Sequence, residues 1–404
     1  MKKTLVLLGT MLLLAVVLVA CGGKPEPTAA PTAAPVDTTP TPAPVVVAVP
    51  NMEGWESSGH NDVSSEAFRH WDADGEVPTS CAKCHTSTGY QDYLGADGSA
   101  ANAVDAAVPA DHAQGVQCET CHNPTAQNLN SVEFPGYTVD EAGNEVHYTV
   151  TGFGDASRCL VCHQGRESKA SVDAQIAEFK AQDAPDTVVA PTKNDQGEDV
   201  NFGFRNIHYY AAAATLFGTE VKGGYEYDGQ LYDAKFDHVE GRDTCVGCHD
   251  PHTLKVKVDE CALCHGDGVK EEGGLQNIRE PQASAWDYDG DGNLEEGMFY
   301  EIQGLQEALL AQIESYAKDT AGAEIKYDAA TYPYFMGADG KAYPNWTPRL
   351  LKAAYNYQYS VKDPGVFAHN PDYILQVLYD SIEAVGGDVS SFTRPPVTPP
   401  AASS

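Results

Sequence analysis

The sequence predicts a mainly α-helical, loop-rich fold with little strand, and three observations lead to this prediction. A short cysteine motif recurs five times between residues 81 and 265. Around it, over residues 51–280, apolar periodicity is weak, and Gly, Asp, Asn and Pro recur every few positions as they do in loops and short helices. Over residues 281–390, apolar side chains recur at helical spacing instead.

The recurring motif is CxxCH, and its five copies contain ten of the eleven cysteines. Two thiols at this spacing add across the vinyl groups of a haem, and the following His becomes its proximal iron ligand. Disulfides or zinc sites are the alternatives that cysteine counting allows. However, His is only 13 of 404 residues and yet follows every CxxC pair. The sequence therefore predicts a multihaem cytochrome c fold with five covalently bound haem c groups.

The motifs assign a thioether or iron-ligand role to each of their cysteines and histidines. The predicted thioether cysteines are Cys81, Cys84, Cys118, Cys121, Cys159, Cys162, Cys245, Cys248, Cys261 and Cys264. The predicted proximal ligands are His85, His122, His163, His249 and His265.

The second axial ligands are predicted to be histidines as well. After Cys21 the chain has only three methionines, whereas eight further histidines are available. Since Met ligation raises the potential of a haem, bis-His ligation predicts low-potential carriers. The distal candidates are His60, His70, His208, His238, His252 and His369. Polar surroundings favour a surface position for the other two, His112 and His147.

Two of these candidates carry more specific expectations. His252 lies three residues after His249, and three residues span about 10 Å at most. That reach is too short to pass round the edge of the His249 haem to its opposite face. His252 would therefore serve another haem, either that of His265 or one of the first three. His208 stands in the Ala-rich run FRNIHYYAAAATLFG, whose small side chains would let a helix lie flat against a haem. CALCH begins sixteen residues after the start of CVGCH, and this short spacing predicts that their two haems are tightly coupled neighbours.

The N-terminal residues predict export and lipid anchoring. Residues 1–20 have two lysines followed by an uncharged apolar run, the layout of a signal peptide. The next residue is Cys21, and LVAC resembles a bacterial lipobox; an uncleaved membrane anchor is the alternative. Residues 21–50 are rich in Pro, Thr and Ala and predict an extended tether. We expect an exported lipoprotein on the outer face of a membrane, in the periplasm or at the cell surface.

The chain is strongly acidic, with a formal net charge of −33. This charge excludes nucleic acid as a partner. It either serves solubility or attracts cationic partners and metal ions. The partners that we expect are other redox proteins or extracellular electron acceptors.

Three helices are predicted between residues 281 and 390. The first places Ile302, Leu305, Leu309, Ile313 and Tyr316 on one face. The second begins with Thr347 and Pro348, and the third begins with Asn370 and Pro371 and stops at Gly386. We expect these helices to pack with the haem region as one unit, followed by a disordered tail at 391–404.

A calcium site is predicted in DYDGDGNLEEG, residues 287–297. Asp287, Asp289 and Asp291 occupy positions 1, 3 and 5 of an EF-hand-like loop, and Gly292 occupies position 6. Position 12 is Met298 in place of the bidentate Glu, so Glu295 or Glu296 would have to substitute. An acidic turn without calcium is the alternative. The candidate ligands are Asp287, Asp289, Asp291, Asn293, Glu295 and Glu296.

The chain resembles secreted multihaem (pentahaem) c-type cytochrome lipoproteins, through segments such as CHQGRES, GGYEYDG and CHDPHT. Residues 353–382 also resemble the C-terminal helix pair of the pentahaem ammonia-forming nitrite reductases, in which a His before Asn-Pro ligates a haem. That His corresponds to His369 here. Those enzymes bind their catalytic haem through CxxCK, and no motif here ends in Lys, which argues against carrying over their activity.

Electron transfer is the leading function, because bis-His ligation leaves no iron open to a substrate. A reductase of a small nitrogen or sulfur oxyanion, with one open haem, is the alternative. A third interpretation is a structural subunit of an extracellular cytochrome assembly.

Overall fold

The computed structural model describes residues 48–194, 196–279 and 286–397. Residues 49–404 form one compact unit. The predicted signal peptide, Cys21 and residues 21–47 of the tether lie outside the described residues. Within the described ranges, no helix has the length and apolar character needed to cross a membrane.

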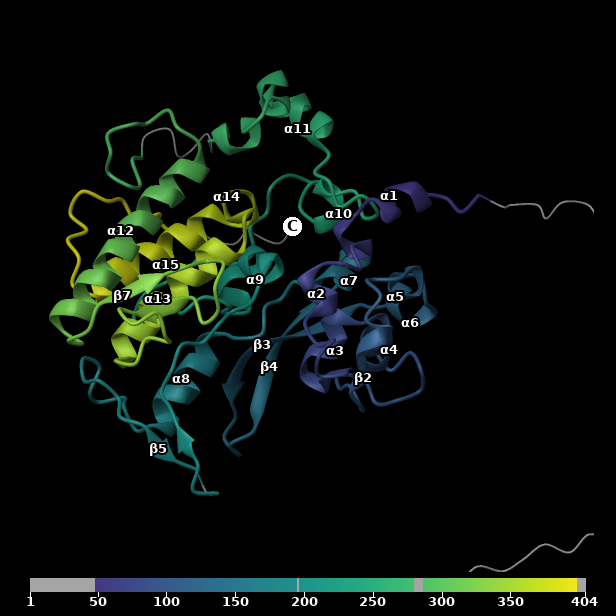
Figure 1. The fold of residues 1–404 in the computed structure, drawn as a ribbon. Coiled ribbons are helices and arrows are strands. Elements are labelled where there is room, and N and C mark those ends of the chain that lie inside the picture. Colours follow the sequence, from purple (N-terminus) through teal and green to yellow (C-terminus); the bar gives the residue numbers. More distant parts are fainter. Residues whose placement is uncertain (1–47, 195, 280–285, 398–404) are drawn as a thin grey trace, which may run out of the picture. The chain divides into compact units, whose positions relative to one another are not determined.

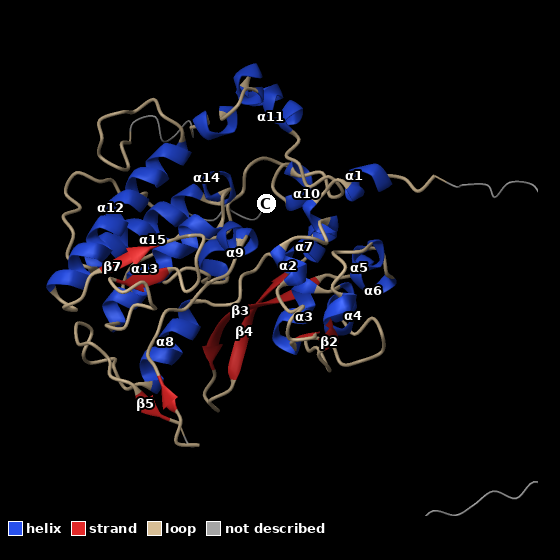
Figure 2. Cartoon of the chain, viewed as in Figure 1, coloured by secondary structure: helices blue, strands red, loops and turns tan. Residues whose placement is uncertain are grey.

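The chain before residue 280 consists of short helices and turns joined by loops and short strands (Figures 1 and 2). They are α1 (Met52–Glu56), α2 (Glu66–Arg69), α3 (Thr79–His85), α4 (Ser87–Tyr93), α5 (Cys118–Cys121), α6 (Pro124–Gln127), α7 (Ser157–Leu160), α8 (Lys169–Glu178), α9 (Ala212–Phe217), α10 (Cys245–Cys248) and α11 (Val258–His265). The 3₁₀ turns are η1 (Gly59–Asn61), η2 (Ala110–His112), η3 (Gly154–Ala156), η4 (Gly218–Glu220), η5 (Asp267–Lys270) and η6 (Gly274–Asn277).

Strands occur only as antiparallel pairs among the described residues. The pairs are β1 (Glu76–Val77) with β2 (Val108–Pro109), β3 (Ser131–Val139) with β4 (Glu145–Thr151), β5 (Thr192–Lys193) with β6 (Asp199–Val200), and β7 (Ile325–Tyr327) with β8 (Phe335–Gly337). The longest pair, β3–β4, shifts register between Glu133 and Tyr137. The prediction of a mainly α, loop-rich fold with little strand is confirmed.

The C-terminal helices pack on one another, and all of them except α14 are longer than the helices before residue 280 (Figure 1). They are α12 (Met298–Asp319), α13 (Pro348–Lys362), α14 (Val366–His369) and α15 (Pro371–Ala384). All five residues predicted for the apolar face of α12 are buried. The predicted caps are present: the Thr347 hydroxyl accepts from the backbone N–H of Leu350, and the Asn370 side chain accepts from that of Tyr373. Gly386 has a φ of +83°, which suits a residue just past a helix end.

The main core joins the C-terminal helices to the haem region. It includes Leu305 and Leu375 from the helices and Leu160 and Val161 from the third CxxCH motif. A smaller cluster surrounds the first motif through Phe68, Val77, Ala82, Val108 and Ala113.

The helices also hold the segment GGYEY by hydrogen bonds. The Asn356 side chain accepts from the backbone N–H of Tyr225 at 2.7 Å and donates to its carbonyl at 2.8 Å. The Tyr355 hydroxyl donates to the carbonyl of Gly223 at 2.6 Å. A Cβ at Gly223 would lie 2.6 Å from the Cβ of Ala214, so a side chain does not fit there.

Hydrogen bonds fix the last described residues of the chain, up to residue 397, to the rest of the fold. The backbone N–H of Thr393 donates to the carbonyl of Tyr288, and the Arg394 guanidinium donates to both oxygens of Asp380. The expected disordered tail therefore stays a prediction only for residues 398–404, which lie outside the described residues.

Candidate haem-binding sites

The five motifs, numbered first to fifth in chain order, all place their two cysteines on a helical turn or at its edge, in α3, α5, α7, α10 and α11. The local sequence explains one such turn: the Thr244 hydroxyl caps α10 by accepting from the backbone N–H of Gly247. The ten motif cysteines are free thiols. In the described part of the chain, the groups that could hold a bare metal ion consist only of carboxylates. Within the described residues, the motif cysteines are thus neither paired as disulfides nor part of such a group, and their attachment to haem stays a prediction.

Three proximal histidines are oriented by backbone carbonyls. Since a carbonyl only accepts, the Nδ1–H of each imidazole donates to it, and Nε2 remains available to iron. The distances from Nδ1 to the carbonyl oxygen are 2.7 Å for His85 and Ala67, 3.1 Å for His163 and Tyr210, and 3.1 Å for His249 and Leu254. Side-chain patterns could not reveal these acceptors, because every residue carries a carbonyl.

Three proximal histidines face a predicted distal histidine. A bond between a first-row metal and a His nitrogen is about 2 Å long, and the ring centre lies about 1 Å further, so two axial imidazoles of one iron have ring centres about 6 Å apart. The observed ring-centre distances are 5.8 Å for His85 and His208, 6.0 Å for His122 and His252, and 6.1 Å for His238 and His265. The residues present therefore fit bis-His haem binding.

The surroundings of His60 and His369 include the third proximal histidine. Burial, together with the neighbouring His163, lowers the pKa of His60 to about 4. The pKa of His163 is likewise lowered, chiefly by burial, and His369 and His249 contribute to the lowering. Nδ1 of His369 lies 2.8 Å from a carboxylate oxygen of Asp363, which orients the ring. Asp363, six residues earlier in the chain, was not predicted.

His208 lies differently from the expectation. It precedes the Ala-rich helix, because α9 begins only at Ala212, and its φ is +81°. Its Nδ1 is buried and has no hydrogen-bond partner, and burial lowers its pKa to about 4. Ala213 and Ala214 of this helix are buried in the main core.

His252 faces the second motif. Its ring is stacked on that of His122 at an interplanar angle of 8°. Of the two alternatives for His252, this geometry favours a haem of the first three motifs over that of His265. The fourth and fifth motifs are nevertheless connected, because the backbone N–H of Lys257 donates to the carbonyl of Cys248 at 2.8 Å.

The three other histidines have acidic neighbours on exposed positions. His70 is hydrogen-bonded to Glu66 at 2.8 Å and packs edge-on against Trp71, and its distal role stays a prediction. His112 and His147 lie near Asp111 and Glu145 respectively.

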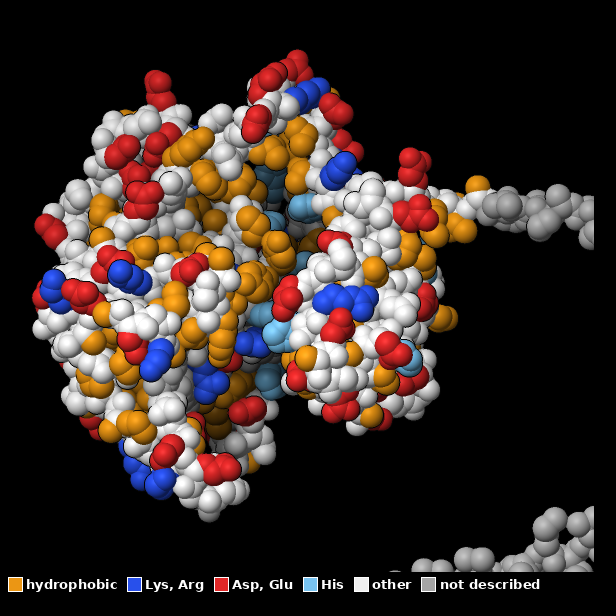
Figure 3. All heavy atoms as spheres, viewed as in Figure 1, with side chains coloured by type: hydrophobic (Ala, Val, Ile, Leu, Met, Phe, Trp, Pro, Cys, Tyr) orange, Lys and Arg blue, Asp and Glu red, His pale blue; other side chains and the backbone are white. Residues whose placement is uncertain are grey.

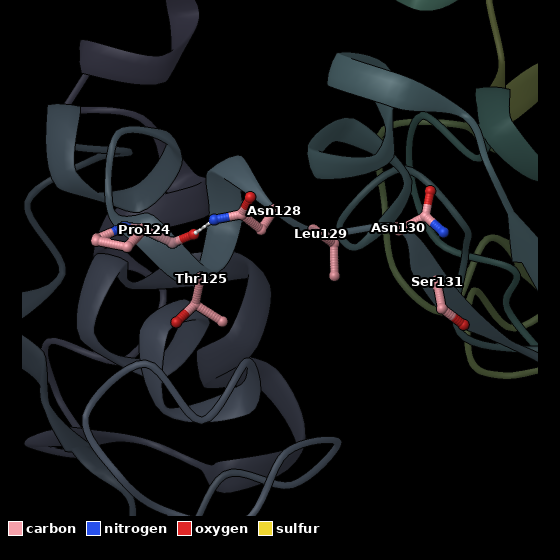
Figure 4. Close-up of a pocket in the computed structure, with 6 residues that line it drawn as sticks. All are labelled: Pro124, Thr125, Asn128, Leu129, Asn130 and Ser131. Carbon is pink, nitrogen blue, oxygen red and sulfur yellow. Dashed lines mark hydrogen bonds between the residues drawn. The ribbon is translucent and has the colours of Figure 1, made fainter.

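The surface shows where these groups lie. Figure 3 shows histidine side chains gathered in a hollow, with Lys or Arg side chains beside them. A separate depression of about 510 Å³ is lined by residues 124–125 and 128–131, among them Asn128, whose Nδ2 donates to the Pro124 carbonyl (Figure 4). It carries no titratable side chain and no sulfur, so it offers no ligand for iron.

The acidic loop gathers carboxylates as predicted and adds one. Ligand atoms of Asp287, Asp289 and Glu301 lie within 4.8 Å of one another, as do those of Asp289, Asp291 and Glu296. Burial, together with the charges of the neighbouring carboxylates, raises the pKa of Asp289 to about 7. Glu301 lies on α12 beyond the loop template, and the template therefore missed it.

Comparisons with known proteins agree with the motifs. The family model described as cytochrome c554 and c-prime matches residues 49–123. The C-type polyheme cytochromes OmcB and OmcC of Geobacter sulfurreducens are each 25% identical to the chain, over 395 and 384 residues. These alignments cover 80% and 81% of the chain but only 46% and 45% of the two relatives, so it spans about half their length.

The comparisons support a multihaem c-type cytochrome. No solved structure matches the chain. The likeness to these cytochromes covers four fifths of the chain and so extends beyond the residues that the family model matches. The resemblance of residues 353–382 to nitrite reductases stays a prediction.

Proposed function

We propose that the protein transfers electrons through five covalently attached, bis-His c-type haems. The observation that carries the proposal is the spacing of three histidine pairs at 5.8–6.1 Å, which suits two axial ligands of one iron. Each bound haem would take up and release one electron at its iron, with no bond made or broken. The chain would hold each haem through two thioethers and two imidazoles.

The two remaining proximal histidines are assigned from charge and burial. His60 and His369 are both electrostatic neighbours of His163, and we assign His60 to the third motif. We therefore assign His369 to His249 at the fourth. In this map His208, His252, His60, His369 and His238 serve the first to fifth haems in that order. His70, His112 and His147 are left at the surface.

The protein residues around the irons would set orientation and potential. The carbonyl acceptors of His85, His163 and His249 fix the tautomer that presents Nε2. Asp363 does the same for His369 and adds electron density to that ligand. Imidazole on both sides keeps the potentials low, because no Met ligand raises them.

Intact mass and low-temperature EPR test the proposal. The expected mass includes five haems on the ten motif cysteines. The ferric protein should give low-spin signals only, and adding nitrite should leave them unchanged. A high-spin ferric signal that changes with nitrite would instead support the reductase of a small nitrogen or sulfur oxyanion.

We also propose that the protein is exported and anchored through Cys21 on the outer face of a membrane. The likeness to polyheme cytochromes supports export, since haem c is attached outside the cytoplasm. The prediction is that Cys21→Ser moves the holoprotein from the membrane fraction to the soluble fraction. A variant that stays in the membrane would point to an uncleaved anchor.

The acidic loop is proposed as a structural calcium site. The convergence of Asp289, Asp291 and Glu296 supports it, because a divalent cation would neutralise carboxylates that repel one another. Titration calorimetry of the holoprotein with calcium should show one site that Asp289→Asn removes. Absence of heat in the unchanged protein would leave only an acidic turn.

The proposed partners are other redox proteins or extracellular electron acceptors. The net charge of −33 supports cationic partners and favours binding that weakens as salt is added. The same charge argues against nucleic acid.

A further inference from the structure

The third motif meets the first motif through paired contacts. The Cys84 thiol donates to the carbonyl of Val161 at 3.9 Å, and the Cys162 thiol donates to the carbonyl of Lys83 at 3.7 Å. The Cys84 and Cys162 thiols are also close enough that each shifts the pKa of the other. Because a c-type haem is bonded to both cysteines of its motif, these contacts bring the attachment edges of the first and third haems together.

The second and fourth motifs contact the third motif on its other cysteine. Arg158, which precedes Cys159, donates from Nη1 to the carbonyl of Cys121 at 3.2 Å. The Cys159 and Cys245 thiols are close enough that each shifts the pKa of the other. Helix α10 of the fourth motif packs on η3, the turn that leads into the third motif. The third motif is therefore bordered by the first, second and fourth motifs together.

The fifth motif is held by the fourth. Lys257 donates its backbone N–H to the carbonyl of Cys248 and its Nζ to that of Val246, both at 2.8 Å. The Cys261 thiol in turn donates to the carbonyl of Lys257 at 3.6 Å. An ion pair between Arg242 and Glu260 ties the same two segments.

We infer that the third motif, Cys159–His163, is the junction of the array. The order in space is first, third, fourth and fifth, and the second lies beside both the third and the fourth. The stacking of His252, which follows the fourth motif, on His122 of the second supports that last contact. This order differs from the order of the motifs along the chain. The inference rests on the proposed haem attachment, and it names the haem through which the first would reach the others.

A ligand substitution at the junction tests the order. His60→Met should raise the potential of the third haem, since Met ligation raises haem potentials, so that it is reduced first. A reduced low-spin haem is diamagnetic, and the EPR signals of its ferric neighbours change. The expected result is a change in the signals of the first, second and fourth haems and none in that of the fifth. The first is recognisable because the rings of His85 and His208 lie at 73°, which gives a strongly anisotropic signal.

His238→Met is the matched control, because it makes the fifth haem the first to be reduced. Only the signal of the fourth haem should then change. If the EPR signal of the first haem does not change when the third haem is reduced, the inference that the third motif is the junction is wrong. If His60→Met fails to hold its haem, an experimental structure of the unchanged holoprotein decides the matter: a first haem whose nearest neighbour is the second overturns the order. A nitrite-sensitive high-spin iron would overturn the proposed function and leave this arrangement standing.

Discussion

The third and fifth motifs have the same chemistry but lie in opposite surroundings. In CLVCH, Leu160 and Val161 are fully buried and belong to the main core shared with the C-terminal helices. In CALCH, Leu263 is 80% exposed, and helix α11 has no buried residue. The protein core therefore fixes the position of the third motif, whereas the fifth motif is positioned by its ties to the fourth. The same sequence signature thus says which residues bind haem but not how firmly the fold holds them.

Removing the attachment cysteines should show this contrast most strongly. Cys159→Ala with Cys162→Ala deletes a haem at the meeting point of the core and three other motifs. We expect a loss of more than about 4 kcal/mol in the free energy of unfolding, or no folded protein, because buried space is left unfilled. Cys261→Ala with Cys264→Ala should give a folded protein with one haem fewer. Intact mass and thermal unfolding measure both, and equal losses would contradict the comparison.

The leucines inside the two motifs form a matched pair that leaves the cysteines intact. Leu160→Ala should lower the free energy of unfolding by about 2–5 kcal/mol, because it opens a cavity in the main core. Leu263→Ala should change it by about 0.5 kcal/mol or less. Denaturant unfolding of the two holoproteins, with haem content checked by absorbance, gives the difference. A costly Leu263→Ala would mean that the fifth motif is buried in the holoprotein.

Asn356 tests how the haem region is fastened to the helices. Asn356→Ala leaves the backbone N–H and carbonyl of Tyr225 without their side-chain partner inside the protein. We expect a loss of about 1–3 kcal/mol in the free energy of unfolding, the usual cost of an unsatisfied buried polar group. Asn201→Ala, at an exposed position, is the control. Similar free energies of unfolding for the two variants would show that water can replace the hydrogen bonds that Asn356 makes to the backbone of Tyr225.

The helical region was predictable because its signals are local. The apolar face of α12 and the caps at Thr347 and Asn370 follow from residues a few positions apart. The arrangement of the haem region was not predictable, because the positions of its motifs in space depend on contacts between segments that are distant in the sequence. Nothing near Cys84 indicates Cys162, and Tyr210 orients His163 through a carbonyl that leaves no side-chain pattern.

The candidate ligands were predictable by type but not by pairing. The excess of histidine over methionine favoured bis-His ligation, and six distal candidates could be named. The pairing of distal and proximal histidines depends on how the loops fold back and bring distant segments together. For the same reason Glu301, on a helix beyond the acidic loop, was missed.

The smallest expected effect is a pH dependence where the two regions meet. Glu226 accepts hydrogen bonds from Thr219 and from Tyr373 of α15, and burial raises its pKa. The folded state therefore binds the proton more tightly than the unfolded state, so stability falls as pH rises from about 4 through the raised pKa.

Glu226→Gln removes this titration and keeps a hydrogen-bonding side chain of the same shape. The difference in melting temperature, variant minus unchanged protein, should grow over that pH range and then stay constant. Glu240→Gln, at an exposed position, should leave the dependence as it is. A difference that does not vary with pH would mean that Lys222, 3.8 Å from the carboxylate, offsets the cost of burial and that the interface tolerates the charge.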